Sequence, residues 1–166
     1  MGLFEKILKK KEPNIFEQIS ELLLAKGIKF RKEGEIFKFE ANVDERIIGC
    51  MLVCDMTRSL LIFSAVLPYQ IPKNRMLEFI EMIARFNEKI WYGSFEFSFE
   101  YNMISLVTTL PIDNAAISYE QLERLCFNNL LNVHYFQFGF EKILNSEFKF
   151  EDVCKEIITK YQNNKN

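Results

Sequence analysis

The sequence predicts an α+β domain in which helices pack on an antiparallel β-sheet. Residues 71–110 have the pattern of one helix followed by one β-hairpin. Short connections join the three strand-like segments before them, which favours an antiparallel meander. The chain also has 17 Phe against a single Trp, which favours a core of large flat side chains lying on a sheet. The predicted order is therefore a three-strand meander, a crossover helix, a β-hairpin and further helices.

Length and composition limit the class of protein. The 166 residues suit one domain, residues 1–166, and the net charge of −2 lacks the broad basic footprint of a nucleic-acid binder. No apolar run reaches the roughly 20 residues that span a bilayer, and the sequence shows no secretory signal pattern. We therefore expect a cytoplasmic protein without a membrane span, in which Cys50, Cys54, Cys126 and Cys154 are free thiols.

The first residues, Leu3–Lys11, could form a short amphipathic helix with a basic turn. Such a helix could bind a membrane surface or a partner, which would make the protein a membrane-surface adaptor. One basic turn is too little for stable membrane binding, so docking of this segment on its own domain is the favoured interpretation.

The next segments are a helix over residues 14–26 and three strands over residues 35–41, 47–55 and 60–67. Gly27 ends the helix, as a glycine of left-handed conformation often does. The second and third strands are apolar on both faces, which predicts central strands covered on both sides. The helix that begins at Pro72 supplies one cover, and a terminal helix or a second copy of the chain supplies the other.

The central helix and hairpin have a specific expected packing. The apolar stripe of the helix is predicted from residues at helical spacing, namely Met76, Leu77, Ile80, Ile83 and Ala84. Residues 94–100 alternate strictly between polar and aromatic side chains, which is the period of a half-buried strand. A two-residue turn at Tyr101-Asn102 sets a register that places Phe99 opposite Ile104, Phe97 opposite Leu106 and Phe95 opposite Thr108.

The C-terminal part is predicted to be helical. Ser118 is a plausible N-cap for a helix that Gly139 bends or ends, and an extra helix runs over residues 150–161.

No residue pattern supports catalysis or metal binding. Cys50 and Cys54 lie about 13 Å apart along an extended strand, too far to chelate one ion. His134 is the only histidine, and the sequence places no acid or nucleophile beside it. Glycine-rich phosphate loops and nucleophile elbows do not occur. We therefore assign no catalytic, cofactor or metal residue, although a deep pocket with a carboxylate or thiol beside His134 would favour an enzyme.

A family resemblance rests on positions that carry the fold. These are Leu67-Pro68, Ile71-Pro72, Asn87, residues 93–97, residues 104–106 and Ile117-Ser118. Over residues 14–144 the chain resembles the YbjN family of bacterial sensory-transduction regulators and, more broadly, type III secretion chaperones. The resemblance implies a chaperone-like fold, binding to another protein and a homodimer, and it supplies no cofactor or catalytic residue.

The leading hypothesis is thus a non-enzymatic protein-binding module, a chaperone-like adaptor or regulator that forms a homodimer. The alternative is a small-molecule binder or enzyme with a pocket between the sheet and the C-terminal helices. Asn87 and Trp91 are candidate interface residues, because a Trp at an element junction is often a contact anchor. The competing interpretation makes them a structural cap and an aromatic residue at the edge of the core.

Overall fold

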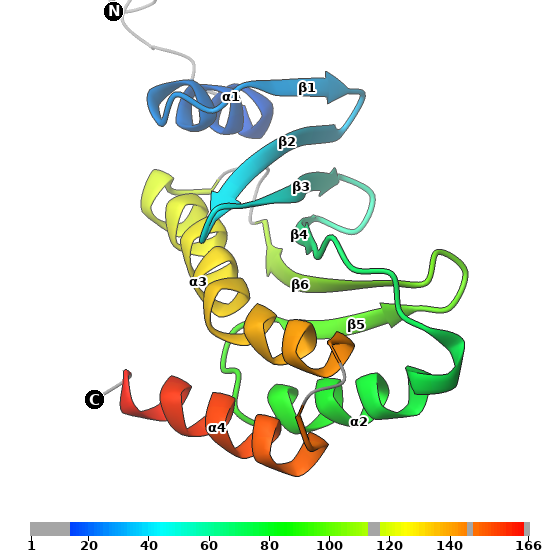
Figure 1. Cartoon of the computed structure of the whole chain (residues 1–166). Helices are drawn as coiled ribbons and strands as arrows, with labels where there is room; N and C mark the ends of the chain where they lie inside the picture. The colour runs from blue at the N-terminus through cyan, green and yellow to red at the C-terminus, as the bar shows by residue number, and fades with distance from the viewer. Residues whose placement is uncertain (1–13, 113–116, 146–147, 165–166) are drawn as a thin grey trace, which may run out of the picture.

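The computed structural model describes residues 14–112, 117–145 and 148–164. It contains a six-stranded antiparallel sheet of spatial order β1-β2-β3-β4-β6-β5, which confirms the predicted α+β class (Figure 1). The strands are β1 (Phe30–Glu33), β2 (Ile36–Val43), β3 (Arg46–Asp55), β4 (Leu60–Val66), β5 (Ser94–Ser98) and β6 (Met103–Pro111). The helices are α1 (Ile15–Ala25), the 3₁₀ helix η1 (Lys73–Arg75), α2 (Met76–Asn87), α3 (Tyr119–Leu144) and α4 (Phe150–Asn163).

The helices gather on one face of the sheet. Helix α3 crosses this face, α1 lies beside β1 and β2, and α2 lies beside β5 (Figure 1). Helix α4 packs on α2 and α3. The fourth helix confirms the predicted C-terminal addition.

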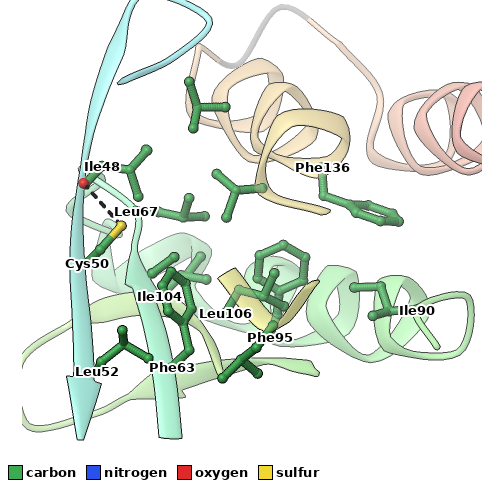
Figure 2. Close-up of a cluster of buried hydrophobic side chains, with 14 of the residues drawn as sticks. Ile48, Cys50, Leu52, Phe63, Leu67, Ile90, Phe95, Ile104, Leu106 and Phe136 are labelled. Carbon is green, nitrogen blue, oxygen red and sulfur yellow. Dashed lines mark hydrogen bonds between the residues drawn. The ribbon is translucent and has the colours of Figure 1, made fainter. Parts of the chain in front are cut away.

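Phenylalanine rings fill the space between the sheet and the helices. The Phe86 ring of α2 lies 4.6 Å from that of Phe136 and 5.4 Å from that of Phe140, both on α3. The Phe95 ring of β5 meets the same two α3 rings edge-on, at 5.8 and 5.2 Å. Figure 2 shows Phe95 between the sheet residue Leu106 and Phe136 of α3. Edge-on and tilted pairs are the preferred aromatic geometries, so the sheet–helix layer is a closely packed aromatic core.

The predicted helix starts are confirmed by their caps. The Asn14 side chain accepts from the Glu17 amide and the Ser118 side chain from the Gln121 amide, and each cap is completed in return by the side chain of Glu17 or Gln121. Such reciprocal bonds satisfy amides that have no partner within the helix.

Two predicted strand features were wrong. Strand β1 was missed because its four residues, of sequence FRKE, are mostly charged and have no apolar alternation. The hairpin register is displaced by two residues, since Phe95 pairs with Leu106 and Phe97 with Ile104. A displacement of two keeps every side chain on its predicted face.

The turn between β5 and β6 explains this displacement. It spans four residues, 99–102, because the Tyr101 amide donates to Ser98 Oγ at 3.3 Å and Asn102 adopts a φ of 53°. The Asn102 side chain also donates from Nδ2 to the Ile71 carbonyl at 2.9 Å, a long-range contact that the local sequence pattern does not predict.

Two predicted helix features were also wrong. The buried face of α2 consists of Phe79, Met82, Ile83 and Phe86, whereas Leu77 is 82% exposed. This helix has apolar residues on two sides, and the larger aromatic side chains occupy the core.

Gly139 neither bends nor ends α3, which continues to Leu144. A Cβ atom at Gly139 would lie 2.8 Å from Phe86 Cζ and 3.2 Å from Ile157 Cγ1. The glycine therefore permits the close approach of α2 and α4 to α3.

Candidate protein-binding surfaces

The second face of the sheet carries apolar side chains that no described helix covers. We call this surface the open face, and its central apolar residues are Met51, Val53, Ile62, Val66 and Val107. They are only partly buried, while their neighbours along the same strands, such as Leu52 and Phe63, are fully buried beneath the helices. Charged residues stand at its two sides, Lys38 and Glu40 on β2 and Glu96 on β5. The result is an apolar centre with a polar rim, which is typical of an interaction surface.

The sequence predicted that the central strands are covered on both sides, and the described structure shows a cover on one side. One cover is present, although it comes from α3 and α1 as well as from the helix after Pro72. Among the residues that the structure describes, nothing supplies the second cover. The expected N-terminal helix, Leu3–Lys11, lies outside the described residues.

A second surface is a groove between α3, α4 and the segment that joins α2 to β5. Its volume is about 240 Å³. We call it the aromatic groove; it is lined by Trp91, Tyr92, Asn128, Leu131, Asn132, Tyr135, Tyr161 and Asn164. Four of these residues are aromatic, three are asparagines, and none is Asp, Glu, Lys or Arg.

The backbone that carries Trp91 and Tyr92 is held in place from several sides. The Asn132 side chain donates from Nδ2 to the Tyr92 carbonyl at 3.0 Å, and its Oδ1 accepts from the Tyr161 hydroxyl at 3.1 Å. Gly93, with a φ of 76°, is packed so closely that a Cβ atom would lie 2.2 Å from Thr108 Oγ1. Trp91 is nevertheless 82% exposed. A firmly held loop thus presents a large aromatic side chain to solvent.

The two predicted interface residues lie in different environments. Trp91 lines the aromatic groove. Asn87 contacts the edge strand β5, where its Nδ2 donates to the Phe95 carbonyl at 2.9 Å and its Oδ1 accepts from the Phe95 amide at 2.7 Å. These two bonds satisfy outward backbone groups of an edge strand, which limits the addition of another strand there.

His134 lies beside a carboxylate, but outside the aromatic groove. Its Nδ1 is 2.5 Å from Asp44 Oδ2, and the Gln137 amide donates to the same oxygen at 3.0 Å. Asp44 and Glu45 form the β2–β3 turn with φ values of 49° and 65°, a left-handed region that is uncommon for residues other than Gly, Asn and Asp, such as Glu45. The contacts of Asp44 with His134 and Gln137 therefore hold the β2–β3 turn against α3.

The four cysteines are free, as predicted. Burial raises the pKa of Cys50 and Cys126 to about 12 and that of Cys54 and Cys154 to about 11. Thiols with such high pKa values stay protonated at neutral pH and are poor nucleophiles. Within the described part of the chain, no group of three or more His, Cys, Asp or Glu residues could hold a metal ion.

The antiparallel sheet with helices on one face defines an α+β domain with the fold of the type III secretion chaperones. More specifically, the chain belongs to the YbjN family, whose model, described as "Putative bacterial sensory transduction regulator", matches residues 17–140. No curated protein matches the sequence.

Three solved structures show the same fold. The crystal structure of YbjN from E. coli aligns with a TM-score of 0.55 and 13% identity, covering 74% of this chain and 90% of that chain. The HopA1–SchA chaperone–effector complex gives a TM-score of 0.50 and 12% identity, covering 72% and 90%. The ExsC–ExsE complex gives 0.50 and 18%, covering 82% and 95%. In addition, none of the described helices is long and apolar enough to cross a membrane.

The sequence indicated Trp91 but not the other residues of the groove. Asn128, Leu131, Asn132 and Tyr135 follow one another at helical spacing on α3, which is a detectable signal. That pattern alone does not reveal that Tyr161, nearly thirty residues later, and the loop after α2 complete the surface.

Proposed function

We propose that this protein is a non-enzymatic adaptor or regulator of the chaperone type, which acts in the cytoplasm as a homodimer and binds another protein. The observation that carries the proposal is the open face. Its apolar centre lies on the three strands β3, β4 and β6 and has no cover among the described residues. Exposed apolar surface is costly in water, and another polypeptide removes that cost.

A second copy of the chain is the proposed cover. The two open faces pack against each other about a two-fold axis, so the same residues contribute from both subunits. Flat antiparallel sheets pack face to face about 10 Å apart. Small residues between the apolar ones, such as Gly49, Ser64 and Ser105, allow this approach.

The similar structures support a protein as the further partner. One is a chaperone–effector complex and another is the ExsC–ExsE complex, so the fold is seen with a bound protein in such assemblies. We transfer to this chain only the class of partner, a polypeptide.

A small-molecule enzyme is the less favoured function. The aromatic groove, at about 240 Å³, is smaller than the roughly 300–1,000 Å³ of usual ligand pockets. His134 and Asp44 do not line it, and their contacts hold a turn.

Substitution on the open face tests the proposal. Ile62→Lys introduces a charge at the centre of the proposed interface, so light scattering after gel filtration should show the mass fall from a dimer to the 19.7 kDa monomer. Leu77→Lys is the matched control, because Leu77 is 82% exposed on α2, outside the open face. We expect it to remain dimeric, and circular dichroism should show both variants folded.

The proposed interface is wrong if the Ile62→Lys variant stays dimeric. It is equally wrong if the Leu77→Lys variant alone becomes monomeric, because the α2 surface would then hold the dimer together.

A further inference from the structure

We propose that the aromatic groove binds an uncharged, proline-containing segment of the partner protein in an extended conformation. This inference rests on the proposed protein-binding function, and it adds the chemistry of the segment that is recognised. Four properties of the groove support it: its fixed shape, its aromatic residues, its hydrogen-bonding groups and its lack of charge.

The groove is held in shape before any ligand binds. Tyr161 is only 3% exposed, and its hydroxyl fixes Asn132, which in turn fixes the Tyr92 carbonyl. Trp91 and Tyr92 are 82% and 62% exposed on this fixed backbone. Because the backbone is already held, binding has to order only the exposed side chains, which lowers its entropy cost.

The rings that can contact a ligand come from two elements, the loop before β5 and α3, while the buried Tyr161 ring of α4 packs behind that of Tyr135. Trp91 and Tyr92 belong to the loop before β5, Tyr135 belongs to α3 and Tyr161 to α4. The Tyr135 and Tyr161 rings are 5.4 Å apart at an interplanar angle of 71°. Proline-rich segments bind in grooves lined by aromatic rings, against which the proline rings pack.

One of the three asparagines can donate to a peptide backbone, because the side chains of Asn132 and Asn164 already donate within the chain. Asn128 lines the groove, and its side-chain amide has no hydrogen-bond partner among the described residues. The polyproline II conformation has no internal hydrogen bonds, so its carbonyls can accept from such an amide.

The electrostatics favour a neutral segment. No Asp, Glu, Lys or Arg side chain lines the groove. The nearest charges along α3 and α4 are already paired, with Arg124 2.7 Å from Glu120 and Lys160 2.6 Å from Glu156. An anionic lipid or a strongly charged peptide would find no unpaired opposite charge in the lining. The volume of about 240 Å³ suits a short stretch of peptide.

Intrinsic fluorescence gives a direct test, because Trp91 is the only tryptophan in the chain. The full-length protein is titrated with a ten-residue polyproline peptide and, separately, with a ten-residue glycine–serine peptide and with maltotriose. We expect polyproline to shift the Trp91 emission to the blue with saturation, and the other two probes to leave it unchanged.

A pair of tyrosine variants locates the binding. Tyr92→Ala removes a ring from the groove and should weaken polyproline binding by about tenfold, the usual effect of losing an aromatic anchor. Tyr101→Ala is the matched control, because Tyr101 is 61% exposed in the β5–β6 turn, against 62% for Tyr92 in the groove. It should bind like the parent protein.

Several results would overturn the inference. These are the absence of a saturable shift with polyproline, an equal shift with the glycine–serine peptide, a shift with maltotriose alone, or unchanged affinity in Tyr92→Ala. The native mass is measured on the same samples. A dimer that fails to bind polyproline refutes this inference alone, whereas a monomer refutes the proposed dimer.

Discussion

The two faces of the sheet are both apolar, yet the described part of the chain covers only one of them. Phe63 and Ile62 are consecutive on β4, and they illustrate the difference. Phe63 is fully buried beneath the helices, whereas Ile62 lies on the open face and is only partly buried. Alternation along a strand decides which residues share a face, but the number and placement of helices decide which face is closed. We therefore assign the apolar face that the helices leave open to the proposed binding role.

Replacing the buried member of this pair should have the largest effect. Phe63→Ala leaves a cavity in the aromatic core, so we expect the free energy of unfolding to fall by about 3–5 kcal/mol. Ile62→Ala should cost less within one subunit, because this side chain lacks helices against it. Urea unfolding under conditions that dissociate the proposed dimer measures both values. Equal losses for the two variants would show that the faces are not packed differently.

Two glycines, one packed between helices and one on the open face, should show the same difference with smaller changes in stability. Gly139→Ala places a methyl group 2.8 Å from Phe86 Cζ, and the strain should lower the free energy of unfolding by about 1–2 kcal/mol despite the better helix propensity of alanine. At Gly49, on the open face, an added Cβ meets nothing within 4 Å. Under conditions that dissociate the proposed dimer, thermal unfolding should therefore show Gly49→Ala to be neutral or slightly more stable. A destabilised Gly49→Ala monomer beside an unaffected Gly139→Ala would contradict this account.

Local sequence patterns predicted the elements better than their long-range contacts. The helix start at residue 14, the Ser118 cap, the antiparallel strands and the C-terminal helix depend on neighbours in sequence, and all are present. The hairpin register failed because it depends on a contact between Asn102 and Ile71, thirty-one residues apart. The role of Gly139 depends on Phe86 and Ile157, which belong to two other helices.

The candidate site was less predictable than the fold, for the same physical reason. Trp91 stood out because it is a tryptophan at the junction between the central helix and the hairpin. The groove around it depends on the packing of α4 against α3, which brings Tyr161 to Asn132. The apolar residues of the open face were visible in the sequence, but their lack of cover follows only from the arrangement of the helices (Figure 1).

The native mass of the unmodified chain tests the central claim most directly. Sedimentation equilibrium over a micromolar concentration series should give twice the chain mass of 19.7 kDa, because two open faces exclude water from each other. A mass of one chain at every concentration would contradict the account, since the open face would then stay exposed to solvent.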